Sequence, residues 1–154
     1  MAANTGRTVK KHTTFLIDDS GGTLREIQVS SINGVGLTYD EMDVTSFQDA
    51  IKNALPGHAN CVINISGPLD TTASTGNHIV LSGVNGGVTP LSLDVRIGIR
   101  QAWEAGEPQF GITSSATSGF LVRDYIVNPD DATFSATCYV MGGTAPAWGT
   151  TAET

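Results

Sequence analysis

The side chains with the most chemical potential in this sequence are a group of carboxylates in its first third. Asp40, Glu41 and Asp43 lie close together, as do ligands in calcium loops and carboxylates in acid–base pairs. A calcium loop needs further oxygen ligands around a glycine turn, and a glycosidase needs two carboxylates that the fold sets about 5–10 Å apart. The sequence shows neither arrangement, so the segment is interpreted as an exposed or interface loop.

The histidines and cysteines have no spacing typical of a metal centre or a nucleophilic site. His12, His58 and His78 are far apart, and Cys61 and Cys138 lie 77 residues apart. His78 adjoins an apolar stretch and is interpreted as structural. The sequence contains no P-loop, dinucleotide fingerprint or G-x-S-x-G elbow. We therefore expect no enzymatic activity, no cofactor and no metal.

The composition indicates one β-rich domain with many turns. The chain has 154 residues, enough for a substantial core, and only 15% of them are charged. Typical domains carry about 25%, and glycine and small polar residues make up the difference here. The net charge of −7 is unsuited to binding nucleic acid through its phosphates, so we expect no sequence-specific binding of DNA.

Charge is unevenly distributed along the chain. The first twelve residues contain only basic charges, on Arg7, Lys10 and Lys11. A later segment is acidic, with Asp40, Glu41, Asp43 and Asp49. Patches of opposite sign on one subunit favour a head-to-tail contact between copies. The alternative, a solvated tail and a solvated loop, stays open at this point.

The cysteines and the N-terminus bear on where the protein is made. Cys61 and Cys138 fall at inward positions of alternating segments, which favours two buried free thiols over a disulfide. Met1 to Gly6 is polar and no apolar segment follows, so no signal peptide is expected. No apolar run approaches the ~20 residues of a membrane span, and no membrane partner is expected. The expected place of assembly is a cytoplasm.

Alternation of apolar and polar residues predicts most of the elements as strands. The predicted segments are 13–17, 25–31, 61–66, 91–103, 119–127 and 134–140. The first two should pair across a glycine turn. The longest runs from Leu91 to Trp103, with Trp103 facing inward and Arg96 and Arg100 on its polar face. The Thr/Ser/Gly-rich residues 70–77 are expected to form a loop.

One helix is predicted, starting after Thr45 or Ser46 as its cap. Its apolar positions at helical spacing are Phe47, Ala50, Ile51, Ala54 and Leu55, and Pro56-Gly57 ends it. Because strands cluster instead of alternating with helices, a parallel α/β sheet is excluded. A mainly β fold remains, a sandwich or barrel with one short flanking α-helix. The expected organisation is a flexible arm (1–12), a β-sandwich domain (13–142) and a C-terminal extension (143–154).

The order of several short motifs resembles phage tail tube (major tail) proteins. These motifs are Tyr39–Phe47, Leu55–His58, Ser66–Asp70, Tyr125–Val127, Pro129-Asp130, Phe134–Ala136 and Ala147–Thr150. In that family an acidic residue, Asp-Val-Thr and an aromatic precede a Pro-Gly turn, and a strand ending near Gly-x-x-Asp follows. The resemblance covers roughly residues 24–150. The sequence departs from it at Gln48, where the family often has Gly, and at His58, where it often has Leu.

The resemblance implies a structural subunit of the bacteriophage tail. Copies would form hexameric rings stacked into a tube whose lumen holds the tape measure protein and conducts DNA into the host. Tail terminator and distal tail proteins would be further partners, and the location would be the virion tail, assembled in the host bacterial cytoplasm. Expected inter-subunit contacts are Arg7, Lys10, Lys11, Asp40, Glu41, Asp43, Val44, Thr45 and Phe47. The alternatives are a capsid decoration or carbohydrate-binding module, or another virion part such as a tail terminator.

Overall fold

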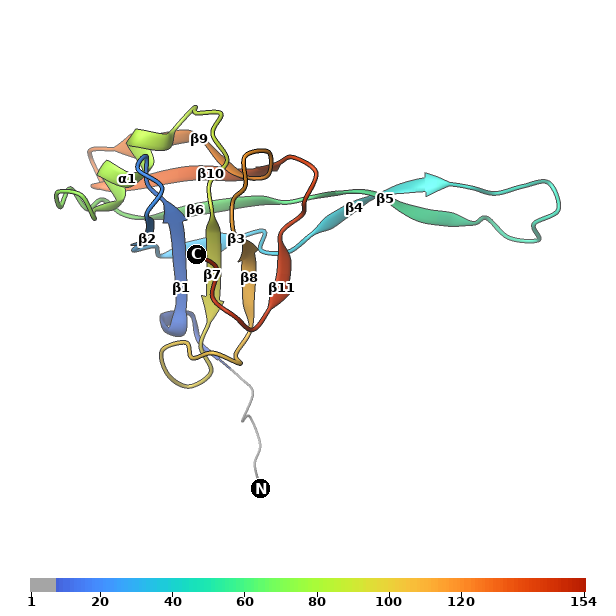
Figure 1. Cartoon of the computed structure of the whole chain (residues 1–154), viewed down its shortest axis with the longest axis horizontal. Coiled ribbons are helices and arrows are strands. Elements are labelled where there is room, and N and C mark those ends of the chain that lie inside the picture. The colour runs from blue at the N-terminus through green and yellow to red at the C-terminus, as the bar shows by residue number, and fades with distance from the viewer. Residues whose placement is uncertain (1–7) are drawn as a thin grey trace, which may run out of the picture.

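The computed structural model describes residues 8–154 as a β-sandwich with one helix and a long protruding hairpin (Figure 1). The elements are η1 (Lys10–His12), β1 (Thr13–Asp18), β2 (Leu24–Ile27), β3 (Ser31–Asn33), β4 (Thr38–Asp43), β5 (Ala54–Asn60), β6 (Val62–Pro68), α1 (Asn77–Val84), β7 (Leu93–Ile97), β8 (Gln109–Ile112), β9 (Gly119–Asn128), β10 (Thr133–Met141) and β11 (Ala147–Gly149). The expected mainly β fold with one short helix is confirmed.

Five strands form one layer of the sandwich in the order β11-β8-β7-β1-β2, all antiparallel. The predicted hairpin between the first two segments is present. Its turn is held by the Asp19 carboxylate, which accepts hydrogen bonds from the backbone N–H groups of Gly21 (2.9 Å) and Thr23 (3.0 Å). Residues 147–149, in the expected C-terminal extension, supply an edge strand of this layer.

Four strands form the second layer in the order β3-β6-β10-β9. The pairing of β9 with β10 shifts register between Ser135 and Thr137. On the opposite strand Asp124 has φ of 55°, which marks a β-bulge that twists the outer part of β9.

The core lies between the two layers and follows from the alternation seen in the sequence. Phe15 and Val95 come from the five-stranded layer, and Ile63 and Phe134 from the four-stranded layer, and all are buried. Helix α1 adds Leu81 to the same cluster. Because alternate side chains of each strand point inward, the apolar set of both sheets meets in one core.

The helix is not where the sequence predicts it. Residues 44–53 form the turn of a hairpin and Ala54 begins β5, whereas the helix spans Asn77–Val84, directly after the segment expected to be a loop (70–77), where no helix is predicted. The Asn77 side chain anchors its start by accepting from the backbone N–H of Asp70 (2.9 Å) and donating to the Pro68 carbonyl (2.7 Å). The position of this helix is therefore set by contacts with residues seven and nine positions earlier in the chain and not by local helix propensity.

The long predicted strand is also shorter than expected. β7 ends at Ile97, because Gly98 packs so tightly that a Cβ there would lie 2.1 Å from the Gln101 carbonyl oxygen, and the chain turns away. Trp103 is half-buried instead of inward. Its ring lies over the guanidinium of Arg96, 5.2 Å from the ring centroid, and its Nε1–H donates to the Glu107 carbonyl at 3.0 Å. Arg100 lies exposed in the loop that follows β7.

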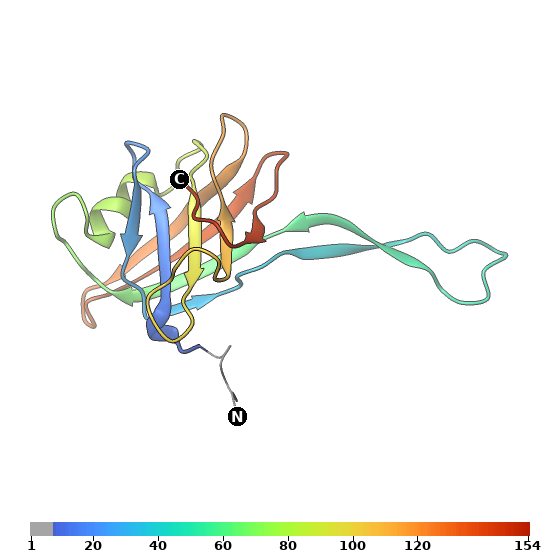
Figure 2. The same ribbon diagram turned by 60° about the horizontal axis from the view of Figure 1, so that its bottom comes forward.

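Strands β4 and β5 form a separate two-stranded sheet, called the hairpin arm (residues 38–60) from here on. Both views show the arm leaving the sandwich and running well beyond it (Figures 1 and 2). At the base of the body, Lys10–His12 form a single 3₁₀ turn before β1. Within residues 8–154, no helix combines the length and the apolar character needed to cross a membrane.

Candidate assembly interface

The hairpin arm is built as a continuation of the four-stranded layer. β5 ends at Asn60 and β6 begins at Val62, so a single residue, Cys61, separates the arm from a central strand. Opposite β5, the register shifts between Tyr39 and Glu41. Gly57 lies at this irregularity and packs closely, since a Cβ there would lie 3.2 Å from the Asp40 carbonyl oxygen and 3.1 Å from the Met42 side chain.

The tip of the arm is ordered by its own polar side chains. The Asp43 carboxylate accepts from the Thr45 backbone N–H (2.9 Å), and the Asp49 carboxylate accepts from the Ser46 backbone N–H (2.7 Å). The Thr45 hydroxyl accepts from the backbone N–H of Asn53 at 2.7 Å. Asp and Thr oxygens that bond nearby backbone N–H groups are typical of turns, so the tip keeps its shape without contacts to the body.

These hydrogen bonds also keep the tip charged. Hydrogen bonds from Thr45 hold the pKa of Asp43 below its ordinary value. The backbone N–H of Ser46 lowers the pKa of Asp49, with help from Asn53. The arm carries one basic residue, Lys52, whose ammonium lies 3.9 Å from Glu41, with both side chains mostly in solvent. An exposed ion pair of this kind contributes little to stability. With one lysine against four carboxylates, the arm carries a net negative charge at neutral pH.

The arm exposes large apolar side chains that nothing in residues 8–154 covers. Phe47 has a relative exposure of 109% and Ile51 of 74%. The others are Tyr39, Met42, Val44 and Leu55. Large apolar side chains gathered on one protruding element mark an interaction site, and an isolated two-stranded hairpin is only marginally stable in water. The arm therefore has the properties of an element completed by a partner.

The sequence-predicted contact residues fall into two groups in the structure. Asp40, Glu41 and Asp43 lie on β4, and Val44, Thr45 and Phe47 lie at the tip of the arm. Lys10 and Lys11 are exposed on η1 at the sandwich, away from the tip (Figure 1). Arg7 lies outside the described residues. Within one chain, the acidic and apolar contact residues therefore lie together on the arm, and Lys10 and Lys11 lie apart from them on η1.

The predicted contacts omit four exposed apolar members of the arm, Tyr39, Met42, Ile51 and Leu55. Ile51 and Leu55 were assigned to a helix, and Tyr39 and Met42 were not among the expected contact residues. In the structure Met42 pairs with Leu55 across the two strands. The available signal was the alternation of polar and apolar residues from Glu41 to Val44, which is typical of a strand.

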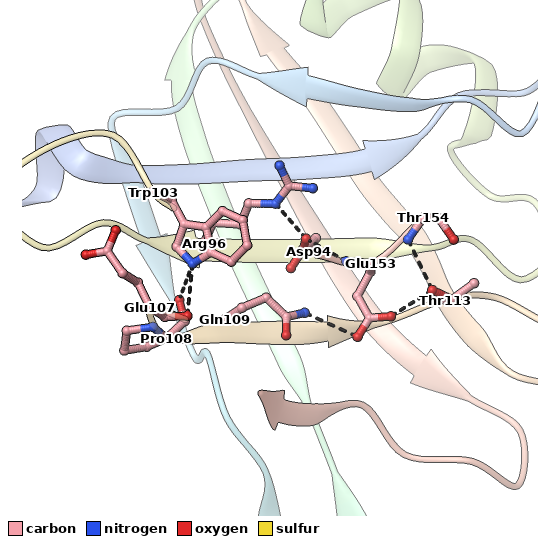
Figure 3. A network of polar contacts seen from close by, with 9 residues as sticks. All are labelled: Asp94, Arg96, Trp103, Glu107, Pro108, Gln109, Thr113, Glu153 and Thr154. Carbon is pink, nitrogen blue, oxygen red and sulfur yellow. Dashed lines mark hydrogen bonds and ion pairs between the residues drawn. The ribbon is translucent and has the colours of Figure 1, made fainter. Parts of the chain in front are cut away.

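A second polar cluster lies on the outer face of the five-stranded layer, around Asp94 (Figure 3). Its side chain is 0% exposed, and it accepts from Arg96 Nε (2.7 Å) and from the Glu153 backbone N–H (3.1 Å). The Glu153 carboxylate in turn accepts from Gln109 (3.3 Å) and Thr113 (2.7 Å). The C-terminal residues thus cover Asp94 and keep solutes from it, so the cluster serves to fix the chain end on the sheet.

The remaining reactive side chains have structural surroundings. His78 Nδ1 lies 2.9 Å from the Tyr125 hydroxyl, between α1 and β9. Cys61 and Cys138 are buried free thiols, as predicted, and burial raises the pKa of Cys138 to about 12. Over residues 8–154, no three His, Cys, Asp or Glu side chains are grouped in a way that would hold a metal ion.

Comparison with known proteins places the fold. No protein-family model and no curated protein gives a significant sequence match. Among solved structures, the chain is similar to one in the sheath-tube complex of an extracellular contractile injection system, PVC, in its extended state. The TM-score is 0.53 at 9% identity, over 97% of this chain and 96% of that one.

Two chains of the anti-feeding prophage are similarly close. One belongs to its tube-terminating cap, with a TM-score of 0.54 at 7% identity over 94% of this chain and 92% of that one. The other belongs to its baseplate, with a TM-score of 0.56 at 7% identity over 93% and 95%. At such low identity the likeness concerns the fold. The chain has the fold of components of phage-tail-like injection particles over nearly its whole length.

Proposed function

We propose that this protein is a non-enzymatic structural subunit of a bacteriophage tail tube. In this proposal, copies form hexameric rings, the rings stack, and the lumen holds a tape measure protein and later conducts DNA into the host. Tail terminator and distal tail proteins contact the ends of the tube in the virion. The observation that carries the proposal is the protruding arm with Phe47 and Ile51 in solvent, on a fold found in tube-forming particles.

The edges of the sandwich support growth by self-association. Within residues 8–154, β2 pairs only with β1, so its other side is open. β9 ends the order of the four-stranded layer, but backbone hydrogen bonds with Leu91 and Gly86 already occupy part of its outer side, at Phe120 and Val122. Exposed strand edges invite pairing with another chain. Contacts between unlike surfaces close into rings or extend into filaments, and a tube needs both.

The test is removal of the apolar tip. Phe47→Ser with Ile51→Ser should abolish rings and tubes in negative-stain microscopy and sedimentation velocity, since burying each such side chain contributes about 1.5–3 kcal/mol. The matched control is Val88→Ser, which removes an apolar side chain that is 81% exposed but lies outside the arm. Circular dichroism should show both variants folded. A wild-type chain that stays monomeric at all concentrations would refute the proposal.

A tube-end component is a second candidate, because the likeness to a tube-terminating cap (TM-score 0.54) equals that to the tube complex (0.53). A cap or terminator stops after one ring, whereas a tube subunit adds rings without limit. The length distribution of the assemblies distinguishes the two.

A further inference from the structure

The surface around the two described lysines is hollowed. A groove of about 530 Å³ is lined by Lys10, Lys11, Thr13, Val29, Ser30, Ser31 and Ile32, and is called the lysine groove. A second hollow of about 380 Å³ shares Lys10, Lys11 and Val29 with it and adds Glu26. The groove lies where η1 and β1 of one layer approach the segment from Val29 to β3 of the other.

The floor and rim of this groove differ in chemistry. Val29 and Ile32 are partly buried apolar side chains that pack against the core, and apolar atoms dominate the lining. Lys10 and Lys11 are exposed at the rim, and Glu26 is the acidic side chain beside them. Pockets of roughly 300–1,000 Å³ bury compact apolar groups well, so the lysine groove has room for side chains of the size of Phe47 and Ile51.

The hairpin tip is the complement of the groove. Its apolar side chains Phe47 and Ile51 are in solvent, and the carboxylates of Asp43 and Asp49 flank them. The tip also lies far from the groove of its own chain, because the arm runs away from the sandwich (Figure 2). A tip can therefore fill a groove only on another copy.

We propose that the lysine groove of one subunit receives the tip of the hairpin arm of a neighbouring subunit. Phe47 and Ile51 cover Val29 and Ile32, and the lysines at the rim pair with the carboxylates of the tip. The inference rests on the proposed self-assembly and assigns its receptor surface. The chain's first seven residues are a poorer occupant, because they contain Arg7 and no acidic residue.

Cysteine cross-linking tests the placement. Ser30→Cys in the groove and Ser46→Cys at the tip are exposed positions, and the native thiols are buried. Mild oxidation of the two variants mixed together should give a covalent dimer. The control replaces Ser30→Cys with Ser82→Cys, an exposed serine on α1, and should give at least tenfold less. Equal yields from both pairs would overturn the placement.

A charge cycle tests the pairing. Lys10→Glu with Lys11→Glu should weaken association about tenfold at low salt, whereas Arg100→Glu, at an exposed position in the loop after β7, should not. Asp43→Asn with Asp49→Asn keeps side-chain oxygens that can accept the hydrogen bonds of the turn. In the otherwise wild-type protein this change should weaken association between copies. In the Lys10→Glu, Lys11→Glu background the same change should instead strengthen association, because it removes repulsion.

The outcomes separate the two proposals. If the Phe47→Ser, Ile51→Ser variant fails to assemble while the lysine reversals assemble normally, the groove assignment is wrong and the tube subunit stands. If the wild type yields neither assemblies nor a specific cross-link, both are wrong.

Discussion

Asp18 and Asp19 show how two adjacent carboxyl groups acquire different properties from their surroundings. Burial raises the pKa of Asp18 above its ordinary value, although the Ser92 backbone N–H donates to it at 2.9 Å. For Asp19 the partial loss of solvent acts in the same direction, but hydrogen bonds in the β1–β2 turn and the guanidinium of Arg25 at 3.1 Å outweigh it and lower the pKa. Asp18 therefore costs stability in its charged form, and Asp19 stabilises the fold in its charged form.

Replacement of Asp18 tests this difference. A raised pKa in the folded state means that stability is lost as pH rises from the ordinary value of 3.8. Asp18→Asn keeps an acceptor for Ser92 and removes the charge, so its free energy of unfolding at pH 7 should equal or exceed that of the wild type. The gap should close below pH 3.8. Urea denaturation between pH 3 and pH 7 measures it, and a variant less stable than wild type only at pH 7 would contradict the assignment.

The two thiols should be inert in the folded protein. Cys61 is 1% exposed and Cys138 is 0% exposed, and a buried thiol with a raised pKa supplies little thiolate to react. Ellman's reagent at pH 8 should label neither cysteine in the native state and both in denaturant. Labelling of one thiol without unfolding would show that the layers open locally around it.

At the scale of single residues, the sequence predicts which side chains face the core wherever polar and apolar residues alternate regularly. The cysteines were placed correctly because β6 and β10 keep strict alternation across seven paired positions. Trp103 was placed wrongly because alternation was carried through Gly98, where the backbone turns. The role of Asp94 was beyond prediction, because its partner Glu153 lies 59 residues away.

At the scale of elements, the hairpin arm shows why periodicity misleads on a protruding segment. The spacing of Phe47, Ile51 and Leu55 is that of an amphipathic helix, and on a globular surface such a face would be buried. Here the sandwich does not lie beneath these side chains, because the arm protrudes from it. The backbone is satisfied instead by pairing β4 with β5, and the apolar face remains in solvent. Strands inside the sandwich were predictable, because each has a buried and a solvated face.

The C-terminal segment is a second element whose contribution can be measured. Glu153→Ala removes the acceptor for Gln109 and Thr113, and Gln109 is only 1% exposed. Leaving a buried donor without its partner costs about 1–3 kcal/mol, which denaturant unfolding should detect. Glu104→Ala, at an exposed position in the loop after β7, is the control and should change stability little. Equal effects would show that the chain end is not held by these contacts.

At the scale of the whole molecule, the structure separates stability from assembly. The core and the network around Asp94 belong to the sandwich, whereas the exposed apolar surface is concentrated on the arm. Changes at the arm should therefore alter association and leave unfolding almost unchanged, and changes in the core should do the reverse. The net charge of −7 adds repulsion between copies, which salt reduces.

This balance gives a prediction for the intact protein. Electrostatic repulsion between whole subunits opposes association, while the proposed lysine contacts favour it, so tube yield should pass through a maximum as salt increases. Light scattering between 10 mM and 1 M NaCl would show the maximum. In the Lys10→Glu, Lys11→Glu variant the yield should instead rise steadily, because no attraction remains for salt to screen. A maximum in both proteins would assign the effect to other charges.

The two legs of the arm enter the body differently. The β4 leg reaches β3 through Gly34 and Gly36, both with positive φ, and the β5 leg passes into β6 through Cys61 alone. The β5 leg is therefore nearly continuous with a central strand of the body, whereas the β4 leg is joined to its strand through two turning glycines. A pull on the tip is then delivered to the middle of the four-stranded layer. In the proposed tube, strain imposed at one end would then be passed from subunit to subunit through β6.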